Sequence, residues 1–307
     1  ALLLLTGATG YLGSALTAAL SARGERFRCL GRREVTCSGA DWMSWDLSEL
    51  ELLSHDAFTD VSAVIHCAGV AHRMASKREY DQINVKGTAL LAESAAMAGV
   101  RHFLFVSSLN VVPPFSADAA ALPEALPEQD EPYARSKWLA ESALKQICDQ
   151  HNMALTVIRP ALLFDRDLTA NLATLERILR WCPCLLPERG HRSLLSRSDL
   201  VELILACVEG KAGAPVGQSV ITATDGGCYS AQTISRLLGP WKTIEDASPL
   251  VLPIWLCKWA GRVLDWRRDL SPGSTWRALS SDHWCGATPE IVGWQSSQTL
   301  KTRRMEA

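Results

Sequence analysis

The chain has 307 residues, of which 48% are hydrophobic, and its formal net charge is −2. A chain of this length and composition can bury a large core, as a globular enzyme of one large domain or two modest ones does. The small net charge supplies no strong field that would attract nucleic acid or an anionic membrane. We therefore expect no nucleic-acid partner and no membrane contact, and expect any partner to bind at a specific site.

The ten cysteines are scattered among apolar segments instead of forming a short, closely spaced framework. This distribution favours free thiols and a reducing cytoplasm over a set of disulfides. Cys182 and Cys184 form a close pair, but without a second pair or nearby histidines they do not match a zinc site. We expect a cytoplasmic protein with no bound metal.

The first predicted element is an apolar strand over residues 2–5, which runs directly into the glycine-rich loop Thr6-Gly7-Ala8-Thr9-Gly10-Tyr11-Leu12-Gly13. Leucines that recur every four residues then predict a helix that ends near Gly24, and residues 26–30 predict a second strand. In such a unit Gly7 and Gly10 let the backbone approach a pyrophosphate, and Gly13 lets the helix touch the strand. The loop indicates dinucleotide binding, with a purely structural turn as the alternative.

Strand-like and helix-like stretches continue to alternate along the chain. We predict strands over residues 61–67, 102–107, 155–158 and 218–222, and helices over residues 87–98, 136–150, 170–181 and 199–209. This alternation predicts an α/β fold with a Rossmann doubly wound parallel sheet that binds ligand at the carboxyl ends of its strands. We expect the dinucleotide-binding domain to comprise residues 1–165 and 193–225, and a smaller substrate-binding lobe to comprise residues 166–192 and 226–307.

Tyr133 and Lys137 stand four residues apart at the start of a predicted helix and therefore share one face. A phenol is too weak an acid to exchange protons at neutral pH unless a neighbouring positive charge stabilises its phenolate. Ser107 and Ser108 follow a predicted strand at the ligand edge of the sheet. The pattern indicates Tyr133 as a general acid or base, with a surface pair on a helix as the alternative.

Together these motifs resemble those of the extended short-chain dehydrogenase/reductase family, and within it the NAD-dependent epimerases, dehydratases and 4-keto-reductases of nucleotide sugars. The resemblance also covers the segments His66-Cys67-Ala68-Gly69, Asn84-Val85-Lys86-Gly87-Thr88 and Ile291-Val292-Gly293-Trp294. It implies that the cofactor contacts comprise Thr6, Gly7, Gly10, Tyr11, Leu12, Gly13, Asp46, Leu47, Ala68, Gly69, Asn84, Ser107, Tyr133, Lys137, Arg159 and Pro160.

The same resemblance implies catalysis by Ser108, Tyr133 and Lys137. The substrate contacts that it implies are Ser108, Asn110, Tyr133, Asn171 and Arg192. Arg192 opens a segment that is similar to the family's Arg-x-x-x-x-x-x-Asp-Leu, and a guanidinium can hold two phosphate oxygens at once. A solvated loop charge is the alternative for this arginine. One departure is Val111-Val112-Pro113 in place of the family's Val-Tyr-Gly, so epimerase-like sugar contacts cannot be assumed there.

The end of the second predicted strand bears on the choice of cofactor. Gly31-Arg32-Arg33 stands eighteen residues after Gly13, at the place where an aspartate would bind the ribose 2′-hydroxyl of NAD. An arginine there accommodates the 2′-phosphate of NADP. Arg32 and Arg33 therefore favour NADP(H), with NAD(H), or two exposed charges without a ligand, as the alternatives.

The resemblance and the two arginines together imply NADPH-dependent reduction of a UDP-4-keto-6-deoxy-N-acetylhexosamine in polysaccharide biosynthesis. The substrate would be a small-molecule UDP-sugar. The alternatives are a UDP-sugar 4-epimerase with bound NAD and a non-catalytic dinucleotide-sensing protein. Because family members are often dimers, the resemblance also implies a homodimer.

Residues 228–307 hold seven of the eleven tryptophans. Trp255 and Trp259 share a helical face, for which we favour core packing over a role at a membrane surface. Lys258, Arg262 and Asp265 interrupt this apolar stretch, so it is not expected to span a bilayer.

Overall fold

The computed structural model describes residues 2–71, 75–114, 132–165, 168, 170–210, 218–240, 250–267, 272–287 and 294–302. Its main sheet has seven parallel strands in the order β3-β2-β1-β4-β5-β6-β9. The strands are β1 (Leu2–Thr6), β2 (Phe27–Gly31), β3 (Ala40–Ser44), β4 (Val61–His66), β5 (His102–Val106), β6 (Ala154–Pro160) and β9 (Gln218–Ala223). The order reverses between β1 and β4, as in a Rossmann sheet, which confirms the predicted fold class.

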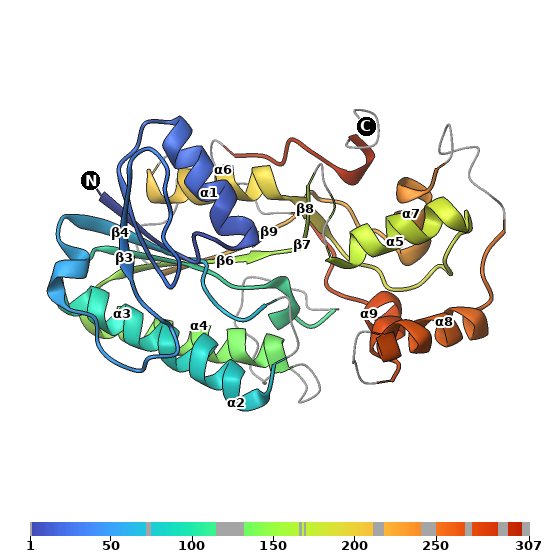
Figure 1. Cartoon of the computed structure of the whole chain (residues 1–307), viewed down its shortest axis with the longest axis horizontal. Helices are drawn as coiled ribbons and strands as arrows, with labels where there is room; N and C mark the ends of the chain where they lie inside the picture. Colours follow the sequence, from blue (N-terminus) through green and yellow to red (C-terminus); the bar gives the residue numbers. More distant parts are fainter. Residues whose placement is uncertain are drawn as a thin grey trace.

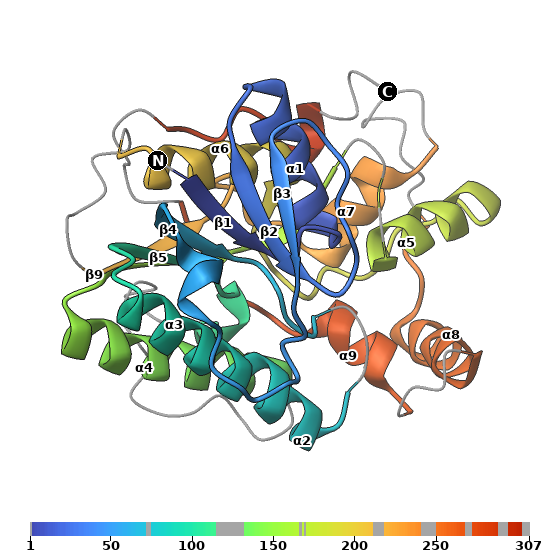
Figure 2. The same ribbon diagram turned by 60° about the vertical axis from the view of Figure 1, so that its left-hand side comes forward.

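Helices cover both faces of this sheet (Figures 1 and 2). One face carries α1 (Tyr11–Ala22) and α6 (Arg197–Val208), and the other carries α3 (Thr88–Met97) and α4 (Pro132–His151). Short segments lead into these helices or link them to the strands: η1 (His55–Phe58), α2 (Lys77–Tyr80), the π-helical η2 (Asp81–Gly87) and η3 (Leu109–Val111).

The leucine run of β1 is explained by these two layers. Leu4 and Leu5 are both fully buried, yet they point to opposite faces of the sheet. Leu5 belongs to the same core as Leu16 of α1, and Leu4 belongs to the same core as Leu91 of α3. A strand that is buried on both faces has no polar side to present, so its sequence is continuously apolar.

A second group of elements extends from one end of the sheet, on the right in Figure 1. It contains the two-stranded sheet of β7 (Leu162–Phe164) and β8 (Leu194–Ser196), and the helices α5 (Ala170–Trp181), α7 (Ala231–Leu238), α8 (Ile254–Arg267) and α9 (Ser274–Ser280). These elements enclose a third core, which includes Phe164, Leu179, Ile234 and Cys257. Among the described residues, no helix has both the length and the apolar character needed to cross a membrane.

Two expectations about this second group are wrong. Cys228 and Cys285 form a disulfide, although the spacing of the cysteines favoured free thiols. Trp255 and Trp259 were expected in a core, but they are 69% and 62% exposed, because α8 turns its opposite face inward. The helical period places the two tryptophans on one face, but it does not say which face the neighbouring elements cover.

Candidate active site

The glycine loop after β1 is shaped by close contacts that only glycine permits. Gly7 has a positive φ of 74°, and a Cβ on it would lie 2.7 Å from the backbone nitrogen of Ala68. A Cβ on Gly13 would collide with the carbonyl oxygen of Gly7. Gly10 caps α1 without a side chain, so the N–H groups of the first helical turn remain directed at the loop. These features fit a cradle for a pyrophosphate.

A cleft of about 860 Å³ opens beside this loop, at the carboxyl ends of β1, β2 and β4. Its walls include many of the predicted cofactor residues, namely Gly7, Gly10, Arg32, Arg33, Asp46, Leu47, Ala68 and Gly69. The structure thus brings together residues that lie more than sixty positions apart in sequence. The arrangement matches the general rule that open α/β sheets bind ligand where the strand order reverses.

The arginines after β2 lie on the rim of this cleft. Both are exposed, and Nη2 of Arg33 donates to Oγ1 of Thr9 in the glycine loop over 3.0 Å. Asp46 faces the same cleft, but its carboxylate accepts from the backbone N–H and the hydroxyl of Ser48. These bonds and the charge of Arg32 lower the pKa of Asp46. The rim therefore presents two guanidinium groups beside one carboxylate that already has partners within the chain.

A buried histidine ties the glycine loop to the sheet and to α3. Nδ1 of His66 lies 2.6 Å from Oγ1 of Thr6, and Nε2 lies 2.8 Å from Oγ1 of Thr88. Thr6 also accepts from the backbone N–H of Ala68. Burial lowers the pKa of His66 to about 3, so the ring is neutral at physiological pH. Thr6 thus fixes the loop through its side chain, and Thr88 is a partner that the sequence did not single out.

Asn84 has a positioning role in the structure. It is buried, and its side chain accepts from the N–H of Val70 and donates to the carbonyl of Val70 and to Oγ of Ser136. This amide therefore fastens the segment after β4, which lines the cleft, to α4. Val70 lines the cleft and Asn84 does not, and the predicted cofactor contact at Asn84 stays a prediction.

Two of the three predicted catalytic residues, Tyr133 and Lys137, stand one turn apart at the start of α4, and the third, Ser108, contacts Tyr133. The Tyr133 phenol is hydrogen-bonded to the Ser108 side chain, and its ring lies 6.2 Å from that of Tyr80. Nζ of Lys137 donates to the carbonyl of Val106 over 2.9 Å. A Cβ on Gly69 would lie 3.9 Å from this Nζ, so Lys137 stands next to a wall of the cleft.

Burial sets the protonation of this group. It raises the pKa of Tyr133 to about 12, against the lowering effect of the hydrogen bond with Ser108. Burial also lowers the pKa of Lys137 to about 8. At pH 7 the phenol is therefore protonated and the amine is mostly charged. The site needs a further positive charge near Tyr133 before the phenolate becomes accessible.

A buried ion pair lies behind the segment of Ser107 and Ser108. Both carboxylate oxygens of Glu141 accept from Arg159, over 3.1 and 2.6 Å, and one of them also accepts from Ser107. Arg159 is fully buried, so its side chain supports the site from within and does not line the cleft. Pro160 pairs with Ala223 in the adjacent strand. Glu141 was missed, although it stands one helical turn after Lys137 on the buried face of α4.

The predicted substrate residues are less closely assembled. Asn110 is exposed in η3, and its N–H donates to Ser108. Asn171 stands in the first turn of α5, but its side chain lies outside the described part of the structure, as do residues 291–293. Trp294, the described end of the predicted C-terminal motif, is buried and donates to the carbonyl of Asp199.

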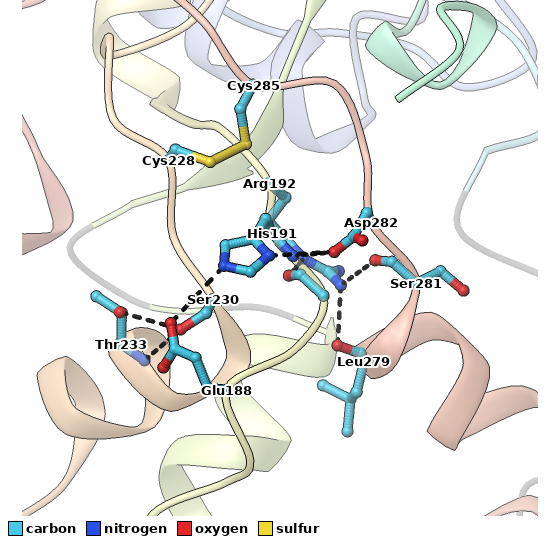
Figure 3. A network of polar contacts seen from close by, with 11 residues as sticks. Glu188, His191, Arg192, Cys228, Ser230, Thr233, Leu279, Ser281, Asp282 and Cys285 are labelled. Atoms are coloured by element: carbon cyan, nitrogen blue, oxygen red, sulfur yellow. Dashed lines mark hydrogen bonds and ion pairs between the residues drawn. A yellow bond between two sulfur atoms is a disulfide. The ribbon is translucent and has the colours of Figure 1, made fainter. Parts of the chain in front are cut away.

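Arg192 is held by backbone carbonyls (Figure 3). Its guanidinium donates to Gly190 over 3.1 Å, to Leu279 over 3.1 Å and to Ser281 over 3.3 Å. Next to it, the disulfide joins Cys228 to Cys285 and thereby holds the segment after β9 against the segment after α9. Arg192 thus already has three protein partners, and a phosphate would have to share or displace them.

Comparisons with known proteins agree with this geometry. The sequence model described as "NAD dependent epimerase/dehydratase family" matches residues 3–221. A UDP-glucose 4-epimerase of Vibrio cholerae is 28% identical over 323 aligned residues, which cover 97% of this chain and 92% of that protein. The solved structure of MoeE5 in complex with UDP-glucuronic acid and NAD has a TM-score of 0.73 at 19% identity, covering 99% of this chain and 97% of that chain. The enzyme WbmG of Bordetella bronchiseptica in complex with NAD has a TM-score of 0.72 at 18% identity, covering 99% and 91%.

Proposed function

The chain belongs to the NAD-dependent epimerase/dehydratase family, and we propose that it catalyses hydride transfer at C4 of a nucleotide-linked sugar, most simply as a UDP-sugar 4-epimerase. The observation that carries the proposal is the hydrogen bond between Tyr133 and Ser108, with Lys137 one helical turn after Tyr133 and next to the cleft wall at Gly69. The similarity to a UDP-glucose 4-epimerase over nearly the whole chain favours a UDP-hexose as the substrate.

The cleft fits a dinucleotide on structural grounds. Added Cβ atoms would collide at Gly7 and Gly13, so the loop keeps its backbone bare where a pyrophosphate would lie. Arg32, Arg33 and Leu47 would line the adenosine end, and Lys137 beside Gly69 would lie at the other end. A bound nicotinamide dinucleotide supplies the hydride acceptor and donor.

The chain's own residues handle the proton at O4 of the sugar. Oxidation of C4 releases the hydroxyl proton, and the Tyr133 phenolate accepts it. Reduction of the resulting ketone consumes a proton, and the Tyr133 phenol returns it to the same oxygen. Ser108, which is already hydrogen-bonded to Tyr133, donates to O4 as charge develops there. Epimerisation requires both half-reactions, and Tyr133 serves both without a second acid.

The phenolate needs positive charge nearby to become accessible. Burial raises the pKa of Tyr133 to about 12, which leaves almost no phenolate at pH 7. A bound oxidised nicotinamide would supply positive charge near the phenol, and we expect the ammonium of Lys137, one helical turn after Tyr133 and held by the carbonyl of Val106, to add to it. The pKa of Lys137, about 8, keeps its amine mostly charged at neutral pH.

A second candidate is a 4-keto-sugar reductase that uses NADPH. The observation in its favour is the rim of the cleft, where the two residues directly after β2 are Arg32 and Arg33. A reductase must draw hydride from a reduced pool, whereas an epimerase recycles one bound NAD. The 2′-phosphate of NADP would lie against these two guanidinium groups.

One set of assays separates the candidates. The purified protein is incubated with UDP-glucose, UDP-N-acetylglucosamine and a UDP-4-keto-6-deoxy sugar, each with NAD, NADPH or no added cofactor. An epimerase interconverts C4 epimers without net change in absorbance at the NADPH wavelength, and a reductase oxidises NADPH only with the keto sugar. Tyr133→Phe is the control: either enzyme loses turnover, and cofactor binding persists. If no sugar nucleotide is converted under any condition, the chain is a dinucleotide-binding protein without this chemistry.

A further inference from the structure

Helix α8 carries three exposed tryptophans along one face. Trp255, Trp259 and Trp266 are 69%, 62% and 82% exposed. Steps of four and seven residues return to the same side of a helix, so the three indoles form one stripe. We call this surface the tryptophan face. A contiguous exposed apolar surface beside polar residues is typical of an interaction site.

The tryptophans stay outside because the opposite face of α8 is fixed. Cys257 and Gly261 are buried there, and a Cβ on Gly261 would lie 3.3 Å from Trp276 of α9. The carboxylate of Asp265 accepts from the N–H of Gly273 over 2.7 Å and from the N–H of Thr275 over 2.8 Å. These contacts fix the rotation of the helix about its axis and so direct the tryptophan face outward.

The exposed charged side chains of α8 itself are all positive. Lys258, Arg262 and Arg267 of α8 are exposed. Asp265 is the only acidic residue within Ile254–Arg267, and it is buried among its partners in α9. The helix therefore presents indoles and cations together, although the whole chain has a net charge of −2.

From this combination we propose that α8 docks on the surface of a lipid bilayer that contains anionic headgroups. Tryptophan favours the zone between headgroups and acyl chains, because its ring is apolar and its N–H is polar. Cations beside it meet phosphate groups, and a helix with such a face lies flat in the interface. Figures 1 and 2 both show α8 at the outer edge of the molecule, away from α1 and α3.

A second copy of the chain fits this face less well. The core of a protein interface is depleted of charged residues, whereas cations here flank the tryptophans. A two-fold contact would press the same face of both copies together, so the exposed cations of one α8 would lie across from a surface that also carries only exposed cations of α8. An anionic bilayer neutralises these charges instead. The proposal does not depend on the reaction proposed above.

The test is sedimentation of the full chain with vesicles. The protein should bind vesicles of phosphatidylglycerol and phosphatidylcholine in equal parts, and should bind vesicles of phosphatidylcholine alone more weakly. Replacement of Trp255, Trp259 and Trp266 by Ser together should lower the partition coefficient by about tenfold or more. The matched control is Met97→Ser on α3, which also removes an exposed apolar side chain (68% exposed) and should leave binding unchanged.

Charge reversal tests the contribution of the cations beside the tryptophan face. Lys258→Glu with Arg262→Glu should lower binding to the anionic vesicles by about tenfold or more, and high salt should have a similar effect on the wild type. Lys301→Glu, at an exposed position outside α8, is the control. Circular dichroism and the thermal midpoint of unfolding show whether each variant is folded. If the triple Ser variant does not fold, the comparison of the charge-reversed variant with the wild type tests the proposal in its place.

Two results would overturn the proposal. The first is a vesicle result: either the wild type fails to bind anionic vesicles, or the triple Ser variant binds them as well as the wild type does. The second is an oligomeric result: in analytical ultracentrifugation the wild type is a dimer and the triple Ser variant is a monomer, while both bind vesicles equally. The tryptophan face would then belong to a second copy of the chain.

Discussion

Arg159 and Glu141 form a bidentate ion pair inside the protein, with each carboxylate oxygen accepting from a different guanidinium nitrogen. Arg159 is fully buried, and Glu141 also accepts from Ser107, the neighbour of the predicted catalytic residue Ser108. The pair therefore links β6 and α4 to the segment that delivers Ser108. The same ion pair therefore stabilises the packing of α4 on the sheet and holds the segment that carries Ser108 in place.

Glu141→Gln is expected to destabilise the protein strongly. The change removes the negative charge and leaves Arg159 buried without a counter-charge, at a cost of roughly 3–5 kcal/mol in the free energy of unfolding. Urea denaturation of both proteins measures this loss. The double variant Glu141→Leu with Arg159→Met replaces both charges by apolar groups and should recover most of the stability. If the double variant is no more stable than Glu141→Gln, the unpaired charge is not the cause.

The pH dependence of stability should report on His66. Because burial lowers the pKa of His66 from 6.5 to about 3, the unfolded chain binds a proton that the folded chain excludes between these values. The contribution of neutral His66 to the free energy of unfolding is therefore fully present above pH 6.5 and is lost as the pH falls toward 3. Between pH 7 and pH 5 this residue should account for about 2 kcal/mol of lost unfolding free energy.

His66→Gln removes that titration. Its unfolding free energy should be lower than that of the wild type at pH 7, but it should fall less steeply toward pH 5. His151→Gln, at a partly exposed surface position, serves as the control and should keep the wild-type slope. An unchanged slope in His66→Gln would mean that other groups dominate the acid sensitivity.

Cofactor preference should depend on the rim arginines. Arg32→Ala with Arg33→Ala is expected to weaken NADP binding by about 10- to 100-fold, because each guanidinium loses a charge-assisted bond to the 2′-phosphate. NAD binding should change little. Fluorescence titration with both dinucleotides measures the two dissociation constants, and Arg26→Ala just before β2, at its opposite end, is the control. A wild-type protein that binds NAD at least as tightly as NADP would instead support the epimerase with bound NAD.

The disulfide should stabilise the second group of elements. Replacement of Cys228 and Cys285 by Ser is expected to lower the unfolding free energy by roughly 2–4 kcal/mol, since the bridge restricts a long segment of the unfolded chain. The control pair is Cys182 and Cys184, whose sulfur atoms lie 4.0 Å apart in a hydrogen bond and form no disulfide. In the wild type, a reducing agent should likewise lower the thermal midpoint of unfolding, because it breaks the disulfide. Equal losses for the two pairs would contradict this role.

The sequence predicted the parts of the fold that repeat a simple pattern. Apolar runs identified six of the seven strands of the main sheet, because strands that are buried on both faces are continuously apolar. β3 was not predicted, because Ala40–Ser44 at the sheet edge is partly exposed and mixes polar with apolar residues. The glycine loop and the pair of Tyr133 and Lys137 were found because their spacing alone constrains geometry.

The spacing of residues in the sequence does not predict contacts between distant segments. Arg159 ends a strand and so resembles a ligand contact, and only the packed structure shows that Glu141 lies against it. Likewise, Cys228 and Cys285 are 57 residues apart, and nothing in the intervening sequence indicates that they meet. The substrate roles of Asn110, Asn171 and Arg192, and the division into two domains, stay predictions.

The bridge between Cys228 and Cys285 encloses α7, α8 and α9 in a covalent ring. A protease that cuts one peptide bond inside this ring leaves a single molecule, because both fragments remain attached through sulfur. Such a nicked protein would migrate as one species on a gel without reducing agent and as two with it. Limited digestion can therefore identify accessible peptide bonds around the tryptophan face without releasing that face from the enzyme.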